Sequence, residues 1–339
     1  MKFVFCGPIP PGGLPEAAFL CYNTADLSEK RVRYGQYLYF EWEPALIEWL
    51  QAHIGSAGTA IAAFISNFGE ELFLVAILGF LYWCWDKKTG ATVGLTLLTV
   101  SVWNPMIKNI ALRQRPYMAH PNVKCLKPVD SGADIMDVAA QGYSFPSGHS
   151  SSTAGTYGAA ATCFKKRWLT ILAIVLVFLV GVSRFILGVH YPTDVMVGWV
   201  LGIIAMLIVT TLEKKLEKRW MLYAILIAVA IPGMFYCTTN DYFSAFGMLC
   251  GMAGGDLFER KFVHFENTRN PLFMILRLIG GIAVFFGMNT VLKMPFSSAF
   301  LSSGTSAAFA VRSLRYALVI FVCLGLYPVL FKLVEKKKK

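Results

Sequence analysis

The sequence predicts an all-α protein, a polytopic transmembrane helix bundle with about eight to nine spans. Of its 339 residues, 56% are hydrophobic and only 15% are charged, whereas a soluble domain carries about a quarter charged residues. Apolar segments close to the ~20 residues that cross a bilayer recur along the chain. Short runs of Lys and Arg separate these segments at every second connection, which is typical of cytoplasmic loops.

The N-terminal region divides into two parts. Residues 1–42 contain several Pro and Gly residues and lack a basic stretch followed by an apolar run, so they are predicted to form a tail outside the bundle. Residues 43–67 are moderately apolar and begin amphipathically. This pattern is typical of an interfacial helix or of a weak first span, and the sequence leaves both open.

The central spans follow. Residues 71–86 form the first clear one, which ends in an aromatic belt of Tyr82, Trp83 and Trp85. Further apolar runs follow at 90–107, 149–163, 168–183 and 193–212. The run at 149–163 is rich in small residues, which let helices approach closely in lipid.

Residues 213–339 are predicted to add further C-terminal transmembrane spans. Their apolar runs lie at 220–237, 242–257, 271–292 and 306–332. Gly247, Gly251 and Gly255 recur at every fourth residue within them. This spacing favours close packing inside the bundle, with a homodimer face as the alternative.

The basic clusters predict the topology. They occur at 87–88, 165–167, 214–219, 260–261 and 336–339. Placing them in the cytoplasm puts segments 108–147 and 184–192 at the outer face. The net charge of +11 is then a consequence of topology, and the expected partner is the lipid bilayer of the cell membrane and not a nucleic acid.

The eight cysteines contain no C-x-x-C pair, so neither a disulfide framework nor a metal cage is expected. His, Asp and Cys do not cluster at metal-ligand spacing anywhere in the sequence. No metal and no other cofactor is therefore expected.

The first group of polar residues lies where an apolar run ends, at Lys108, Arg113 and Arg115. Seven residues make about two helical turns, so Lys108 and Arg115 are predicted to share one helix face and to bind an anion there. Snorkelling of both side chains to the lipid headgroups is the alternative. Arg113 is expected to be secondary.

The second group is the run Pro146-Ser147-Gly148-His149 at the entry to a helix. Ser147 suits the N-cap position, and the free N–H groups of a helix N-terminus can bind phosphate. Gly148 lets an oxyanion approach the backbone, and His149 is placed to donate a proton.

The third group is Arg184, His190 and Asp194. Arginine makes bidentate contacts with phosphate. His190 and Asp194 suit a nucleophile with an orienting acid, because a carboxylate on one imidazole nitrogen leaves the other nitrogen free to attack. An interfacial ion pair between Arg184 and Asp194 is the alternative.

Together the patterns K-x6-R-P (Lys108–Pro116), P-S-G-H (Pro146–His149) and S-R-x5-H-x3-D (Ser183–Asp194) resemble the three signature motifs of the type 2 phosphatidic acid phosphatase (PAP2) superfamily. Residues 43–212 would then form a PAP2-type catalytic membrane core. The additional C-terminal spans are similar to those of the sphingosine-phosphate-phosphatase-like branch.

The resemblance implies a lipid phosphatase that hydrolyses a phosphate monoester or a diphosphate through a phosphohistidine, without a metal. His190 would attack phosphorus, Asp194 would orient it, and His149 would protonate the leaving oxygen. The residues that would hold the phosphoryl oxygens are Lys108, Arg115, Ser147, Gly148 and Arg184. The site would face the outside of the cell.

Two other functions use the same sequence features. A lipid phosphotransferase would employ the same site with an alcohol in place of water. A lipid transporter without catalysis would also need spans and membrane charges, but it does not explain two histidines and an aspartate beside cations at one membrane face. Candidate substrates by resemblance are undecaprenyl diphosphate, phosphatidic acid, phosphatidylglycerol phosphate and sphingoid phosphates.

Overall fold

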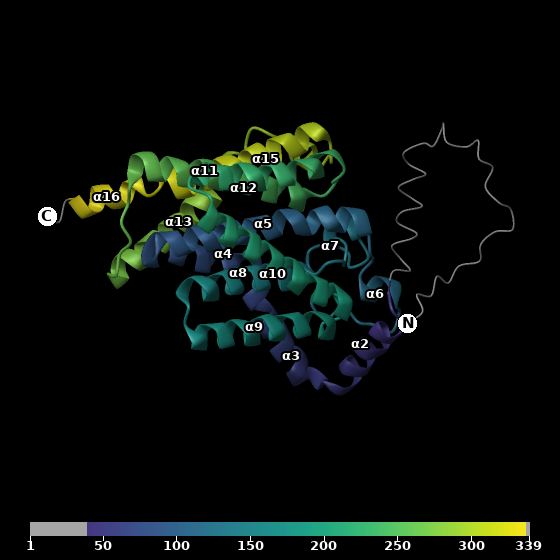
Figure 1. Cartoon of the computed structure of the whole chain (residues 1–339). Coiled ribbons are helices and arrows are strands. Elements are labelled where there is room, and N and C mark those ends of the chain that lie inside the picture. Colours follow the sequence, from purple (N-terminus) through teal and green to yellow (C-terminus); the bar gives the residue numbers. More distant parts are fainter. Residues whose placement is uncertain (1–38, 337–339) are drawn as a thin grey trace.

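The computed structural model describes residues 39–336, and within this range the regular secondary structure is entirely helical (Figure 1). The predicted all-α class is therefore confirmed. Most of the tail expected at residues 1–42 lies outside the described residues.

The segment at 43–67 is neither one interfacial helix nor one straight span. It forms α2 (Trp42–His53) and α3 (Gly55–Ser66), which meet at Gly55 in the left-handed region with φ +64°. After the 3-10 turn η1 (Asn67–Gly69) the chain continues in α4 (Glu71–Phe80). The α3–η1 arm and the arm made of α4 and the π-helical turn η2 (Leu81–Trp85) are bent by 46°, as in a broken span or a re-entrant loop.

Four helices form the centre of the bundle: α5 (Lys87–Ala111), α8 (Gly148–Phe164), α9 (Arg167–Ile186) and α10 (Pro192–Lys215). Small residues bring α8 and α10 close together, since a Cβ atom on Gly202 would lie 2.3 Å from the carbonyl oxygen of Ser151. This approach places the N-terminus of α8 beside the N-terminus of α10. The short helices α6 (Pro116–Ala119) and α7 (Val138–Gln141) lie in the connection from α5 to α8.

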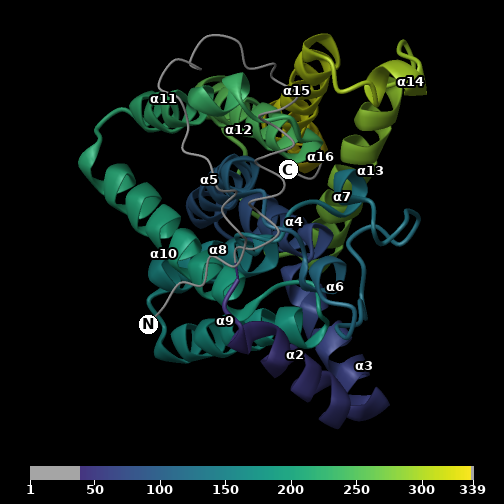
Figure 2. The same ribbon diagram turned by 90° about the vertical axis from the view of Figure 1, so that its right-hand side faces the viewer.

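The C-terminal helices form a layer against α5, on the far side from α9 (Figure 2). In order they are α11 (Arg219–Ala230), η3 (Ile231–Phe235), α12 (Asn240–Phe258), η4 (Glu259–Val263), α13 (Pro271–Val291), α14 (Ser298–Leu301), α15 (Ser306–Phe321), η5 (Val322–Leu326) and α16 (Val329–Lys336). A partly buried ion pair joins this layer to the central helices, because Lys87 Nζ lies 2.9 Å from Glu259 Oε1.

The glycine repeat of α12 packs inside this layer. A Cβ atom on Gly247 would lie 2.1 Å from Ser313 O, and one on Gly251 would lie 2.3 Å from Ala317 O. Both neighbours belong to α15, so the close-packing interpretation is confirmed. These two glycines face α15 of the same chain and are not available for a homodimer contact.

The predicted number of spans was too high. In the described part of the chain five helices are long and apolar enough to cross a membrane, or six if the bent pair counts as one. Three of the predicted spans are not among these helices: α8, which has 17 residues, the short helix Arg219–Phe235, and α12. Helices α8 and α12 pack against protein on several sides, and α8 consists largely of Gly, Ala, Ser and Thr.

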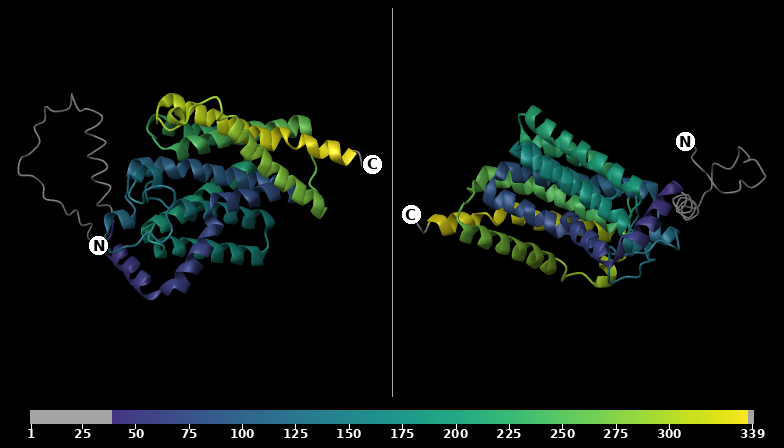
Figure 3. Two further views of the ribbon diagram at one scale, coloured as in Figure 1. Left: turned by 180° about the vertical axis from the view of Figure 1, so that it is seen from behind. Right: turned by 90° about the horizontal axis from the view of Figure 1, so that it is seen from below.

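The bundle has two chemically different ends. Helix α5 begins at Lys87, α9 begins at Arg167 and α10 ends at Lys215, so these basic residues share the end where α16 also lies (Figures 1 and 3). Helices α6 and α7 lie at the opposite end, together with the start of α8 and the turn between α9 and α10. The multi-pass arrangement thus separates the predicted polar site from the basic clusters.

Candidate active site

Backbone contacts bring the three polar segments together at the end opposite the basic clusters. The amide of Ser147 donates to the carbonyl of Asp194 at 3.0 Å, and the amide of Ser144 donates to the carbonyl of Arg113 at 2.7 Å. The side chain of Asn104 on α5 donates to the carbonyl of Pro146 at 3.2 Å. Segments separated by tens of residues in the sequence therefore share one site.

The start of α8 offers an open helix N-terminus. Ser147 is the N-cap, and its Oγ accepts from the amide and the hydroxyl of Ser150. A Cβ atom on Gly148 would meet only Asn104 Oδ1, at 3.8 Å. There is thus room beside the first turn for an anion at the positive end of the helix dipole.

The two nitrogens of His190 face different groups. Nδ1 lies 3.5 Å from Asp194 Oδ2, and this oxygen also accepts from Ser144 Oγ at 2.5 Å and from the Tyr191 amide at 2.8 Å. Nε2 lies 3.3 Å from Arg115 Nη1. The carboxylate favours the tautomer with its proton on Nδ1, which leaves Nε2 unprotonated on the side of the cations.

Arg115 is fixed by backbone carbonyls. Its Nε and Nη2 donate to the carbonyl of Gln141, and its Nη1 donates to that of Val189 at 2.9 Å. The prediction that Lys108 and Arg115 share one helix face is wrong, because α5 ends at Ala111 and Leu112 adopts φ 49°. Arg115 reaches the site from the segment that follows the helix.

Arg184 and Lys108 keep unused hydrogen-bonding capacity. Arg184 donates through Nη1 to Ser66 Oγ at 2.5 Å, while its buried Nε has no hydrogen-bond partner. Lys108 has no ion pair with any residue that the structure describes. A bound phosphate would satisfy both cations.

The electrostatics of His190 indicate which groups surround it. Burial is the main cause that lowers its pKa well below the usual value. The charges that lower it further are those of Arg115, Arg184, Lys108 and His149, in this order. The imidazole is therefore neutral near pH 7, as a nucleophile requires.

His149 lies in the first turn of α8 and faces a carboxylate that the sequence analysis did not identify. Its Nε2 is 3.4 Å from Glu70 Oε1, which also binds Lys127 Nζ at 2.9 Å. Burial, followed by the charge of Arg184, lowers the pKa of His149 to about 4, and Glu70 acts in the opposite direction. Glu70 lies in the break between η1 and α4, where no motif marks it.

Binding of an oxyanion is expected to raise the pKa of His149 from about 4, because the anion offsets the charge of Arg184. Between pH 5 and pH 7 vanadate binding should then be accompanied by proton uptake. Titration calorimetry in two buffers of different ionisation enthalpy measures this uptake, with His149→Gln as the matched variant. Equal proton uptake by the variant would contradict the assignment.

Arg113, which was expected to be secondary, forms two ion pairs inside this site. It is buried, and its guanidinium lies 2.5 Å from Asp194 Oδ1 and 2.6 Å from Glu43 Oε2. The alternative ion pair between Arg184 and Asp194 does not form, because Arg113 takes that place. The sequence offered no signal for Glu43, which lies in α2, 70 residues before its partner.

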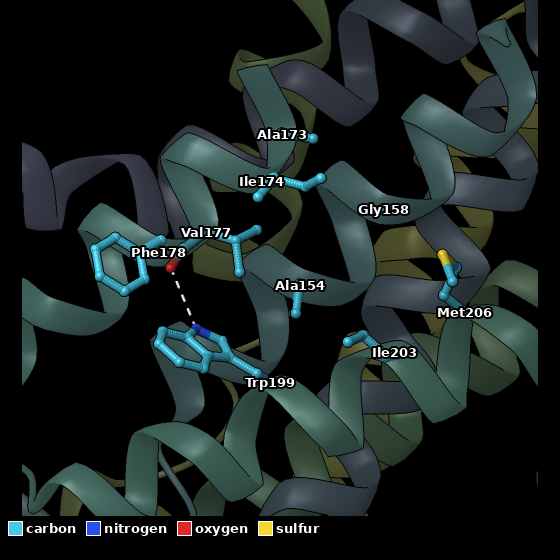
Figure 4. Close-up of a pocket in the computed structure, with 9 residues that line it drawn as sticks. All are labelled: Ala154, Gly158, Ala173, Ile174, Val177, Phe178, Trp199, Ile203 and Met206. Carbon is cyan, nitrogen blue, oxygen red and sulfur yellow. Dashed lines mark hydrogen bonds between the residues drawn. The ribbon is translucent and has the colours of Figure 1, made fainter. Parts of the chain in front are cut away.

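An apolar hollow of about 310 Å³ lies between α8, α9 and α10, and Figure 4 shows its lining. Trp199 borders it and donates from Nε1 to the carbonyl of Val177 at 3.2 Å. The lining contains no titratable side chain. Among the described residues no three His, Cys, Asp or Glu side chains are grouped as a metal site.

Comparison with known families gives two matches. The profile described as the PAP2 superfamily matches residues 89–218. The profile described as a PAP2 superfamily phosphatase, transmembrane extension, matches residues 243–339. The first match contains all three polar segments.

Individual relatives resemble about two fifths of the chain. An undecaprenyl-diphosphatase of Sulfolobus acidocaldarius is 27% identical over 143 residues, which are 42% of this chain and 64% of the relative. A decaprenylphosphoryl-5-phosphoribose phosphatase of Mycobacterium tuberculosis is 34% identical over 146 residues, which are 42% of this chain and 73% of the relative. The matched region thus spans less than two thirds of the archaeal relative.

Among solved structures, the crystal structure of a PAP2-type phosphatidylglycerolphosphate phosphatase from Bacillus subtilis aligns at 24% identity and a TM-score of 0.41. The alignment covers 59% of this chain and 99% of that one. Neither curated relative is a sphingosine-phosphate phosphatase, and the C-terminal region matches the PAP2 transmembrane extension. The expected similarity to the sphingosine-phosphate-phosphatase-like branch is therefore not supported.

Proposed function

Because this multi-pass membrane protein belongs to the PAP2 superfamily, we propose that it is a lipid phosphatase that works through a covalent phosphohistidine. The proposal is carried by one observation: the Asp194 carboxylate lies on the Nδ1 side of His190, and a cation lies on its Nε2 side. Lipid transport without catalysis does not require a buried imidazole that is oriented by a carboxylate on one side and faces a cation on the other.

In the first step Nε2 of His190 attacks phosphorus and a P–N bond forms. The bond from phosphorus to the lipid oxygen breaks, and this oxygen keeps the electron pair and takes a proton from His149. The Asp194 carboxylate stabilises the positive charge that develops on the ring of His190. The dephosphorylated lipid then leaves.

In the second step a water molecule attacks phosphorus and gives a proton to His149, which lost its own in the first step. The P–N bond breaks, the electron pair returns to Nε2 of His190, and inorganic phosphate is released. Each histidine thereby returns to its starting state, as microscopic reversibility requires for an acid that becomes the base.

Positive charge for the phosphoryl oxygens is supplied by Lys108, Arg115 and Arg184 and by the amide of Gly148. The Ser147 hydroxyl is proposed to donate to the same oxygens, because the Ser147 amide already donates to Asp194. Phosphoryl transfer depends mainly on positioning and on neutralising the equatorial oxygens. Three cations and a helix N-terminus meet this need, so we propose that the reaction runs without a metal ion. The unused hydrogen-bonding capacity of Arg184 and Lys108 supports this proposal, because both cations can bind phosphoryl oxygens.

The substrate is proposed to be a long-chain lipid with a terminal monophosphate or diphosphate. The names of the relatives support this class, since they specify undecaprenyl diphosphate and a decaprenylphosphoryl pentose phosphate. The basic residues at the opposite end of the bundle support a site at the outer face of the membrane. We further propose that residues 43–212 form the catalytic core and that residues 213–339 support it.

The test is a phosphate-release assay with purified protein in detergent and EDTA. The panel contains undecaprenyl diphosphate, phosphatidylglycerol phosphate, phosphatidic acid and a sphingoid phosphate. We expect release of inorganic phosphate from the prenyl or glycerol lipids, inhibited by vanadate, which mimics five-coordinate phosphorus. No release from any member, or transfer of the phosphate to an added alcohol with none released, would contradict hydrolysis.

A further inference from the structure

Asp194 is held from both sides. On one side its Oδ2 accepts from Ser144 and Tyr191 and faces His190. On the other side its Oδ1 lies 2.5 Å from Arg113 Nη1, and Asp194 is fully buried. Arg113 therefore contacts the oxygen of Asp194 that does not face His190.

Arg113 is in turn held by Glu43 of α2. Nη2 of Arg113 lies 2.6 Å from Glu43 Oε2, and the other carboxylate oxygen accepts from the amide and the hydroxyl of Thr193, at 3.0 and 2.6 Å. The guanidinium also lies 3.9 Å from the ring centroid of Tyr191. Glu43 is fully buried and Arg113 is 3% exposed.

A second set of contacts, made by Gln51, binds helix α2 to the end of the bundle that carries the polar site. The side chain of Gln51 donates to the carbonyls of Lys124 and Ile186 and accepts from the amide of Lys124. Glu43 is thus presented by an anchored helix. This helix precedes residues 89–218, which the superfamily profile matches.

We propose that Glu43 and Arg113 are positioning residues that hold Asp194 against His190 and set the charge that His190 experiences. The inference rests on the proposed function, because it concerns the same nucleophile. Arg113 pairs with the buried Asp194, and Glu43 offsets part of the Arg113 charge. Asp194, Arg113 and Glu43 together therefore present a net negative charge to the imidazole. A buried arginine between two carboxylates leaves neither acid without a partner.

Other charged groups face the same imidazole and remain constant in the test. They lie on α5 and the segment after it, at the start of α8 and at the end of α9: Lys108, Arg115, His149 and Arg184. The variants below change only the charge on the Asp194 side of His190. A shift in the pH profile can therefore be traced to that side.

Arg113→Gln removes the cation between two carboxylates. The electrostatic potential at His190 becomes more negative, which favours the protonated form of His190. The acid limb of the pH profile, where kcat/KM falls as His190 is protonated, should therefore move to higher pH by about one unit. The turnover number should fall about 10- to 100-fold, the size usual when an orienting partner is lost. KM should change little, because Arg113 does not face the phosphate.

Glu43→Gln should act in the opposite direction on the pH profile. Arg113 then pairs with Asp194 alone, the potential at His190 becomes less negative, and the acid limb should move to lower pH while kcat falls. In the double variant Arg113→Gln/Glu43→Gln the limb should return toward the wild-type position, because one charge of each sign is removed. A role in packing alone predicts no such opposite shifts.

Glu41→Gln is the matched control, since Glu41 is exposed at the N-cap of the same helix and the substitution is the same. It should leave kcat and the pH profile unchanged. Arg113→Lys keeps the positive charge and should shift the acid limb of the pH profile less than Arg113→Gln does. Arg113→Lys is the variant to measure if Arg113→Gln does not fold.

The pH profiles of phosphate release are measured for the wild type and all of these variants. Opposite shifts for Arg113→Gln and Glu43→Gln support the inference, whereas unchanged limbs, or shifts in one direction, overturn it. Failure of the wild type to release phosphate from any lipid would instead contradict the proposed function. The two failures are therefore distinguishable in one experiment.

Discussion

Replacement of His190 by alanine is expected to abolish phosphate release and to leave the protein folded in the membrane. The site holds one imidazole whose Nδ1 faces a carboxylate and whose Nε2 faces Arg115. Without this nitrogen no covalent intermediate can form, and loss of a nucleophile costs about 10⁶-fold in kcat in a well-studied hydrolase. The measurement is inorganic phosphate released per mole of purified protein with the best lipid of the panel.

His53→Ala is the control for this variant. His53 is exposed at the end of α2, so its removal changes the histidine content and leaves the site intact. We expect wild-type turnover from His53→Ala and none above background from His190→Ala. Retention of even a tenth of the wild-type rate by His190→Ala would rule out His190 as the nucleophile.

Replacement of His149 by alanine is expected to separate the two steps of the reaction. A lipid alcohol is a poor leaving group, so loss of the proton donor should lower turnover of the lipid phosphate by about 10²- to 10⁴-fold. An aryl phosphate such as p-nitrophenyl phosphate leaves without protonation and should still phosphorylate His190. Water attack then lacks its base, and the phosphoenzyme should accumulate.

The measurement is the time course of nitrophenol release by His149→Ala. We expect a burst of about one nitrophenol per protein, followed by a slow steady state. Glu70→Gln should have a smaller effect, because Glu70 contacts His149 and not the reacting atoms. If His149→Ala loses activity equally on both substrates and shows no burst, His149 is not the proton donor.

The sequence predicted most helices well, because their apolar runs are bounded by basic residues and prolines. Helix α9 spans Arg167–Ile186 and α10 spans Pro192–Lys215, where runs at 168–183 and 193–212 were expected. The break at Gly55 was not predictable, since a single glycine in an apolar segment is compatible with a continuous helix. The number of spans was overestimated because α8 and α12 pack largely against protein, and because α8 has only 17 residues, most of them small.

The sequence predicted the site residues that belong to local motifs. It did not predict the residues that reach the site only through tertiary packing. Arg113 and Arg115 are two residues apart in a non-helical segment, and they reach different partners: Arg113 contacts Asp194, and Arg115 contacts His190. Helical spacing could not indicate this, because α5 ends four residues before Arg115. Glu43 and Glu70 belong to no motif, and only the folding of α2 and α4 onto the end of the bundle that carries the polar site gives them their partners.

The most direct test of the account is to trap the covalent intermediate. The wild type and His190→Ala are mixed with a lipid substrate labelled with ³²P in its terminal phosphate and denatured in alkali within the first turnovers, and the labelled peptide is mapped. The account predicts an alkali-stable, acid-labile label on the wild-type peptide that contains His190, and no label on the variant. A label on any other residue, or a label that persists in His190→Ala, would contradict it.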